Sequence, residues 1–375
     1  MASERRIKRT HTLRAETPIG HDEVLAGLWG AAQRDRMPHA LLFEGPDGVG
    51  KYLAAEHFVR GLACESGPGT PCGTCGPCKR LVSGNYGDLH VLDIRALGYN
   101  EIKICYLTLR DTEPARKEMD DIHDNVNEFL ALRPAEGGWR VVMIRDAHLA
   151  NENAQNALLK NLEEPGERTL LILVTSRGDR LLPTIRSRCV RFQFGGIPQA
   201  DCESIVRDKG LAAEPAATLS RWSEGAPGRA LELQLRCAPA ILESVFAVLS
   251  GELSPLVGAR AVAEVDGEYL GSTDSAKARH RAQVAVDLAL RVVENRLRIS
   301  VGVAPDGLAF GVELDAAPVG PRAEARVRVC VDDLLTARQD VERSMNADGI
   351  LDRCFLALGR LAPARQSAPV KRRGR

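Results

Sequence analysis

The sequence lacks any long apolar run and any excess of charge of one sign. No stretch approaches the roughly 18–20 apolar residues that span a bilayer. Lys and Arg total 50 against 50 Asp and Glu, a balance that argues against a general polyanion binder. The 44% hydrophobic content excludes global disorder over the 375 residues. No hydrophobic segment follows the basic residues near the N-terminus, so we expect no signal peptide and a soluble, cytoplasmic protein of two or three domains.

A dense disulfide framework is also missing. Most of the ten cysteines are scattered, as reduced thiols that pack as small apolar residues would be. The exceptions are Cys64, Cys72, Cys75 and Cys78, which share one short loop rich in glycine and proline. Four soft thiolates at this spacing predict a closed, tetrahedral Zn²⁺ site with a structural role. An iron–sulfur or redox site stays open as an alternative, although the spacing matches neither common ferredoxin pattern.

Short apolar segments alternate with helical patterns in the first half of the chain. This alternation predicts an α/β fold with a parallel sheet covered on both faces. The expected strands are 40–43, 90–94, 140–144 and 170–174, and the expected helices are 22–35, 51–63, 120–132 and 153–162.

No strand pattern is recognised after about residue 196. Short helices are expected over 200–234, a loop-rich stretch over 251–274, and longer helices over 275–298, 325–345 and 348–361. We therefore predict domains at 1–195, 196–240 and 241–365, followed by a basic, disordered tail at 366–375.

The segment from Gly45 to Lys51 matches the pattern GxxxxGK and lies between an expected strand and an expected helix. In a P-loop of this kind, the backbone amides around Gly45, Gly48 and Gly50 cradle phosphates while Lys51 neutralises them. An ordinary glycine-rich turn is the alternative.

Two residues needed to hold Mg²⁺ are absent from this loop and its surroundings. A working P-loop places Ser or Thr after the lysine, but here Tyr52 follows Lys51. A second carboxylate is expected where the strand 140–144 ends, but Arg145 stands there, before Asp146. We expect ATP binding to be weak or absent and hydrolysis not to occur.

Four motifs occur together in a characteristic order. They are His39–Phe43 before the P-loop, the four-cysteine loop after it, 156–165 (NALLKNLEEP) and 182–189 (LPTIRSRC). In this order they resemble the bacterial clamp-loader subunits of the AAA+ superfamily. The resemblance is strong over 20–195 and weaker over 225–231, and over 240–365 it rests on helical content and on 346–358. It implies an AAA+ P-loop core with a parallel sheet, then a small helical lid and an all-α collar domain.

The resemblance also implies a role. ATPase subunits of this family carry Thr after the P-loop lysine and Asp-Glu at the later strand. Tyr52 and Arg145 depart from both, as the delta-prime type of DNA polymerase III subunit does. This implies a stator that does not hydrolyse ATP and supplies Arg188, in Ser187-Arg188-Cys189, as an arginine finger to a neighbouring ATPase subunit. The implied partners are gamma/tau-type and delta-type subunits and, through the complex, the sliding clamp and primer-template DNA, with no membrane.

Some interpretations remain open at this stage. A catalytically active, gamma/tau-like AAA+ ATPase is the main alternative. A small-molecule P-loop kinase would need neither the four-cysteine loop nor the helical domains. Thr175 and Ser176 suit either a γ-phosphate sensor or strand capping. Residues 95–118 match no part of the family pattern, and the basic tail suits a solvated segment or a DNA contact.

Overall fold

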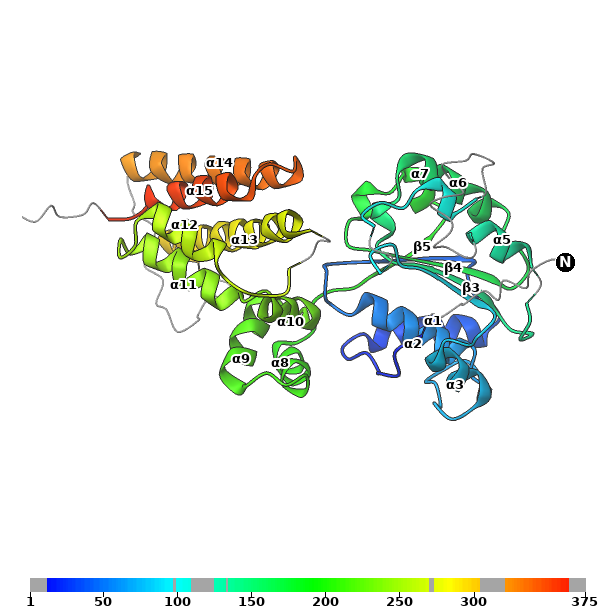
Figure 1. The fold of residues 1–375 in the computed structure, drawn as a ribbon. Helices are drawn as coiled ribbons and strands as arrows, with labels where there is room; N and C mark the ends of the chain where they lie inside the picture. Colours follow the sequence, from blue (N-terminus) through cyan, green and yellow to red (C-terminus); the bar gives the residue numbers. More distant parts are fainter. Residues whose placement is uncertain are drawn as a thin grey trace, which may run out of the picture. The chain divides into compact units, whose positions relative to one another are not determined.

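The computed structural model describes residues 12–96, 99–108, 125–132, 134–269, 273–303 and 321–363. The chain divides into two compact units, Met1–Cys202 and Glu203–Arg375 (Figure 1). Within the described residues, no helix combines the length and the apolar character that crossing a membrane requires.

The first unit is built on a sheet of five parallel strands. They are β1 (Ala40–Glu44), β2 (Leu89–Leu92), β3 (Arg140–Ile144), β4 (Thr169–Thr175) and β5 (Val190–Gln193), in the order β2-β3-β4-β1-β5. All residues of β2, β3 and β4 are buried, as expected for parallel strands covered on both faces. The predicted α/β fold with a parallel sheet covered on both faces is therefore confirmed.

Helices cover both faces of this sheet (Figure 1). On one face lie α1 (Asp22–Gln33), α2 (Lys51–Leu62) and α3 (Gly76–Ser83), and on the other lie α5 (Val126–Ala131), α6 (Glu152–Glu163) and α7 (Pro183–Arg186). Short 3₁₀ turns occur at η1 (Ile104–Tyr106), η3 (Ala147–Leu149) and η4 (Gly178–Arg180). The side chain of Asn151 accepts a hydrogen bond from the amide of Ala154, which fixes where α6 begins.

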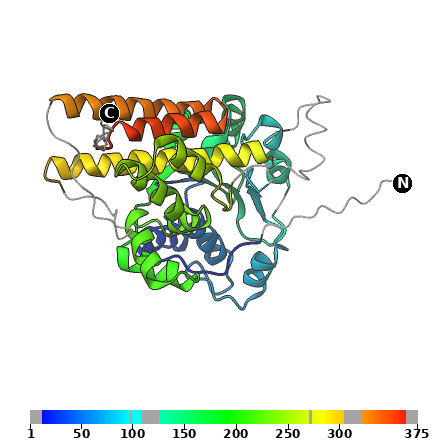
Figure 2. The same cartoon turned by 60° about the vertical axis from the view of Figure 1, so that its left-hand side comes forward.

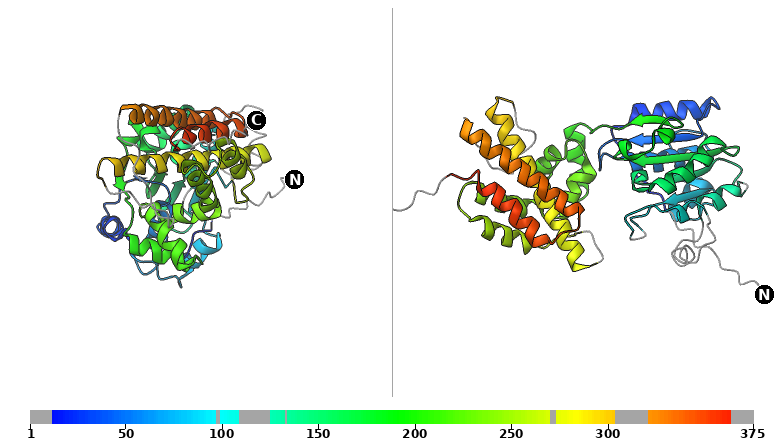
Figure 3. Two further views of the ribbon diagram at one scale, coloured as in Figure 1. Left: turned by 90° about the vertical axis from the view of Figure 1, so that its left-hand side faces the viewer. Right: turned by 90° about the horizontal axis from the view of Figure 1, so that it is seen from above.

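The second unit is all-helical as far as it is described. Its helices are α9 (Ala213–Trp222), α10 (Pro227–Leu235), α11 (Ala238–Leu249), α12 (Pro255–Ala263), α13 (Asp274–Ser300), α14 (Pro321–Glu342) and α15 (Ala347–Gly359). α8 (Gln199–Asp208) spans the division between the units. α14 and α15 run side by side along α13 (Figure 2 and Figure 3). Their apolar faces form one core around Val292, Leu334 and Phe355.

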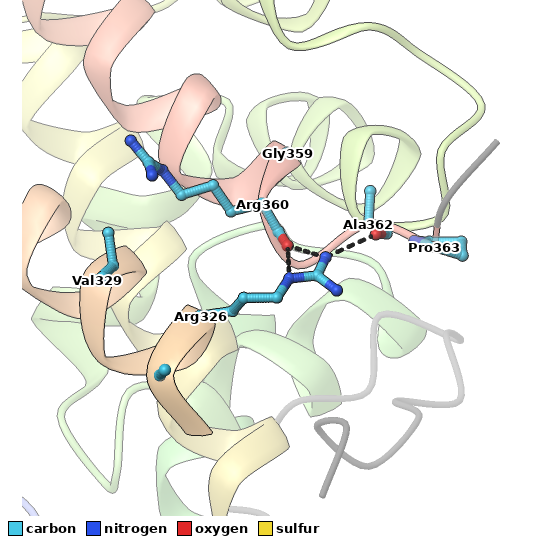
Figure 4. Close-up of a pocket in the computed structure, with 7 residues that line it drawn as sticks. Arg326, Val329, Gly359, Arg360, Ala362 and Pro363 are labelled. Carbon is cyan, nitrogen blue, oxygen red and sulfur yellow. Dashed lines mark hydrogen bonds between the residues drawn. The ribbon is translucent and has the colours of Figure 1, made fainter. Parts of the chain in front are cut away.

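One arginine of α14 forms hydrogen bonds with the backbone at the end of α15. Arg326 donates hydrogen bonds to the carbonyl oxygens of Arg360 and Ala362, which follow the last turn of α15 (Figure 4). A cation at this position satisfies carbonyls that have no partner inside the helix. The groove beside it, about 520 Å³, is lined by Val329, Gly359 and Pro363 among others.

Two elements differ from the expectation. Strand β5 was not predicted, because three of its four side chains are exposed at the sheet edge, only Phe192 is half-buried, and they form no apolar run. The stretch 251–274 was predicted to be loop-rich but contains α12. Within α12, Gly258 is needed for packing, because a Cβ there would lie 2.6 Å from Val248 and 2.8 Å from Phe355.

Smaller differences concern element ends and the cysteine loop. The strand expected at 90–94 is Leu89–Leu92, and the turn-rich cysteine loop contains α3. Of the unmatched stretch 95–118, residues 97–98 and 109–118 lie outside the described residues, as does the tail 366–375. The described part packs inward, because Ile102, Tyr106 and Leu107 are buried beneath α6. The predicted division of lid from collar near residue 240 stays a prediction.

Candidate functional site

The P-loop backbone requires its glycines. β1 ends at Glu44 and α2 begins at Lys51, so the connecting turn leads directly into the N-terminus of a helix. Gly48 and Gly50 have φ of 79° and 101°, a region that L-residues rarely adopt. A Cβ on Gly45 would lie 2.0 Å from the carbonyl oxygen of Phe194. The glycines predicted from the motif are therefore set by backbone geometry, as a phosphate-binding turn demands.

Two side chains hydrogen-bond to backbone carbonyl oxygens of the P-loop. The Nζ of Lys51 donates to the carbonyl oxygen of Pro46 at 2.6 Å, and the lysine is only 6% exposed. Burial lowers the pKa of Lys51, while Asp47 and Asp146 act in the opposite direction. The Nε2 of buried His21 lies 2.7 Å from the carbonyl oxygen of Val49. One of the three N–H donors of the Lys51 ammonium is therefore already used by a backbone carbonyl of the loop.

Tyr52 lies between two arginines at the start of α2. The guanidinium carbon of Arg145 is 4.8 Å from the centre of its ring and that of Arg14 is 5.6 Å away. Arg145 pairs with Asp93 at 2.9 Å and Arg14 pairs with Glu56 at 2.6 Å. We call these five residues the Tyr52 stack.

The electrostatics of the Tyr52 stack oppose a bound metal ion. Burial, reinforced by Glu56 and Asp93, raises the pKa of Tyr52 above its ordinary value, so the phenol stays protonated and neutral. A neutral ring and a permanent guanidinium thus stand where a P-loop enzyme places a hydroxyl and a carboxylate for Mg²⁺. Asp146 is itself paired with Arg95 at 3.1 Å.

Thr175, at the end of β4, is fully buried. Its hydroxyl accepts a hydrogen bond from the amide of Arg177 at 3.0 Å and lies 3.1 Å from Nδ1 of His148. These contacts favour the strand-capping interpretation over a γ-phosphate sensor.

The four clustered cysteines converge in space. Their Sγ atoms all lie within 4.8 Å of one another, and those of Cys64 and Cys75 are 4.0 Å apart. Two thiolates bound tetrahedrally at about 2.3 Å from one Zn²⁺ are about 3.8 Å apart, so this donor set fits a metal ion after a small contraction. Hydrogen bonds, that from the Thr74 side chain first, lower the pKa of Cys72 to about 5, whereas burial raises that of Cys78 to about 12.

The cysteine loop is also fastened to the helices beside it. The side-chain amide of Gln33, at the end of α1, donates to the carbonyl oxygen of Pro68 at 2.9 Å. A Cβ on Gly61 of α2 would lie 2.0 Å from the carbonyl oxygen of Gly69, so helix and loop touch backbone to backbone. An ion held by the four thiolates would therefore act on local stability.

Arg188 follows α7 and precedes β5. Its Nη1 donates to the carbonyl oxygen of Thr184 at 3.0 Å, and its Nη2 lies 2.7 Å from Oε1 of Glu163. The arginine side chain is 36% exposed and that of Glu163 is 49% exposed. Burial raises the pKa of the adjacent Cys189 to about 12, which makes that thiol a neutral packing group.

Gln155 of α6 positions the segment that leads to Arg188. Its Oε1 accepts from the amide of Leu182 at 2.7 Å, and its Nε2 donates to the carbonyls of Ala150 and Arg180. Sequence reasoning missed Gln155, His21 and Asp93, which carry no motif signal. It also missed the pairing of Glu163, although that residue lies inside the 156–165 motif.

The predicted site residues form three separate groups. The four cysteines come together, and the P-loop residues come together with Tyr52 and Arg145. Within the described residues, the polar partners of Arg188 are Glu163 and Thr184, and none of them belongs to the P-loop.

The family model and the relatives that this chain matches are all described as DNA polymerase III subunits. Residues 20–198 match the family model described as "DNA polymerase III, delta subunit". Over 222 residues, 57% of this chain, it is 34% identical to DNA polymerase III subunit tau of Escherichia coli, covering 31% of that protein. Over 227 residues, 60% of this chain, it is 34% identical to DNA polymerase III subunit delta' of Pseudomonas aeruginosa, covering 62% of that protein.

Among solved structures, a gamma subunit-related protein of DNA polymerase III from Thermotoga maritima aligns with a TM-score of 0.44 and 16% identity. The alignment covers 90% of this chain and 99% of that chain. The chain thus spans about a third of the tau relative and about three fifths of the delta' relative.

Proposed function

We propose that this chain is a delta-prime-type subunit of the DNA polymerase III clamp loader, the family of the proteins that it matches. In this role it takes part in ATP-dependent loading of the sliding clamp onto primer-template DNA without hydrolysing ATP itself. Its direct partners are gamma/tau-type and delta-type subunits.

The contact between Tyr52 and Arg145 is the observation that carries this proposal. Both residues depart from the pattern of the ATPase subunits. They contact each other through a cation–π interaction at 4.8 Å, so we interpret them as one coupled change rather than two unrelated losses. The half-buried ring and the guanidinium leave Mg²⁺ without its protein ligands, and γ-phosphate transfer then loses its main charge stabiliser.

We further propose that Arg188 acts in trans. It is half-exposed on the first unit, and the bonds that hold it in place are those of an ordinary surface ion pair, worth about 0–1 kcal/mol. A γ-phosphate is a stronger partner for a guanidinium than one half-exposed carboxylate, because it offers several charged oxygens. Arg188 therefore suits a finger directed at the nucleotide of a neighbouring ATPase subunit.

The cysteine loop completes the proposal with a structural Zn²⁺ held by Cys64, Cys72, Cys75 and Cys78. The alternative function is a catalytically active, gamma/tau-like ATPase. The tau relatives support it as strongly as the delta' relatives do by identity, but Tyr52 and Arg145 oppose it.

An ATPase assay on the isolated chain separates the two functions. We expect turnover at the level of a Lys51→Ala control, with and without Mg²⁺. Steady Mg²⁺-dependent turnover that Lys51→Ala abolishes would establish the ATPase instead.

A further inference from the structure

Glu163 and Thr184 fix the guanidinium of Arg188 from two elements. Glu163 is the last residue of α6, and Thr184 lies in α7. The carboxylate contacts Nη2 at 2.7 Å and the carbonyl oxygen contacts Nη1 at 3.0 Å. Contacts to two nitrogens from two directions favour one position and one orientation of the planar group.

This anchoring leaves donors free for a second partner. A guanidinium carries five N–H donors in a rigid fork, and Glu163 and Thr184 each accept only one of them. The long arginine side chain loses rotamer entropy when it is fully ordered. Contacts that order it within its own subunit reduce the entropy left to lose when a phosphate binds.

The base beneath Glu163 is rigid. Leu158 and Leu162 on α6 are each 2% exposed, and α6 packs against α7. The next residue, Glu164, is an exposed carboxylate with no side-chain contact to Arg188 in the described part of the chain. The two adjacent glutamates therefore offer a matched pair in which only one touches the arginine.

We propose that Glu163 is a positioning residue that orients the guanidinium of Arg188 toward the γ-phosphate of a nucleotide bound to the neighbouring subunit. The proposal rests on the trans-acting role of Arg188. Glu163 itself contacts no nucleotide, and its effect passes entirely through the arginine.

The test is a double-mutant cycle in the reconstituted clamp-loader complex, read as DNA- and clamp-stimulated ATPase. The variants are Glu163→Ala, Arg188→Ala, the double variant and the control Glu164→Ala, with assembly checked by gel filtration. Glu163→Ala should lower kcat about twofold to fivefold and leave the KM for ATP unchanged, because the ion pair is half-exposed and Thr184 still holds Nη1. Glu163→Gln keeps an acceptor oxygen at the same reach and should recover part of the rate. Glu164→Ala should match the wild type.

The double-mutant cycle distinguishes failure of the positioning role of Glu163 from failure of the trans-acting role of Arg188. In the Arg188→Ala background, removing Glu163 should have no further effect. Two outcomes with a reduced rate in Arg188→Ala would contradict the role of Glu163 alone. In the first, Glu163→Ala leaves the rate unchanged; in the second, Glu163→Ala lowers the rate by the same factor with and without Arg188. In both cases the trans-acting role of Arg188 is retained. If Arg188→Ala leaves the rate of an assembled complex unchanged, the trans-acting role fails and the role of Glu163 falls with it.

Discussion

The guanidinium carbon of Arg145 lies 4.8 Å from the centre of the Tyr52 ring, so the two residues that break the P-loop pattern contact each other. Arg145 comes from the end of β3 and Tyr52 from the first turn of α2. The ring and the cation stabilise each other where a hydroxyl and a carboxylate would otherwise share a metal ion. The two departures from the ATPase pattern therefore belong to one set of contacts, in which Asp93 pairs with Arg145 and Arg14 lies over the Tyr52 ring.

The Tyr52 stack predicts which part of the tyrosine matters for stability. Tyr52→Ala removes a half-buried ring and both cation–π contacts, and should lower the free energy of unfolding by about 1–3 kcal/mol. Tyr52→Phe keeps the ring face and should stay close to the wild type. Urea denaturation of both variants checks this. A Phe variant as unstable as the Ala variant would show that the hydroxyl, not the ring, makes the important contact.

The cysteine loop predicts one zinc ion per chain. Cys75→Ser removes one thiolate of the four, so the variant should lose the metal and unfold at a lower temperature. Cys237→Ser, which changes a half-buried cysteine outside the cluster, is the matched control and should keep its zinc. Elemental analysis and thermal unfolding measure both effects. Iron in place of zinc, or metal retained in the Cys75 variant, would contradict the assignment.

His280 predicts a loss of stability in mild acid. Burial, with a further contribution from Arg236, lowers its pKa from 6.5 to about 4 in the folded chain. The unfolded chain therefore binds the proton first as the pH falls, and the contribution of His280 to stability, complete above pH 6.5, is lost between about 6.5 and 4. Because burial also lowers the pKa of His57 and His148, the measurement is a difference. The free energy of unfolding of His280→Gln should fall less between pH 7 and pH 5 than that of the wild type, and equal slopes would contradict the prediction.

Local patterns were sufficient for much of the fold. The strand at 140–144 and the P-loop helix starting at Lys51 were predictable because apolar runs and glycine spacing are local signals. Strand β5 was not, since an edge strand gains its stability from pairing with β1 and needs no apolar run of its own. Helix α12 was not predictable, because glycine is a weak helix former. Gly258 is required by its close packing against Phe355, which lies far away in the sequence.

The candidate site divides in the same way. The spatial cluster of four cysteines was predictable from their spacing, and Arg188 was singled out by its motif, while their roles as zinc ligands and arginine finger stay proposals. The contact of Arg145 with Tyr52 and that of Glu163 with Arg188 join segments far apart in the chain, so only the folded arrangement of β3, α2, α6 and α7 brings them together.

The central claim is that Arg188 acts on a nucleotide bound to another subunit. The direct measurement is DNA- and clamp-stimulated ATPase of the reconstituted complex carrying Arg188→Ala. Arg207→Ala, which removes an exposed arginine from α8, serves as the charge-matched control.

An arginine finger is worth roughly 10³–10⁵ in rate at one site, and the loss in the whole complex should be smaller because other interfaces keep their own fingers. We predict a clear fall in stimulated ATPase with assembly intact, poor rescue by Arg188→Lys because a point charge cannot reproduce the planar fork, and no change in the control. Full stimulation in an assembled Arg188→Ala complex would contradict the account.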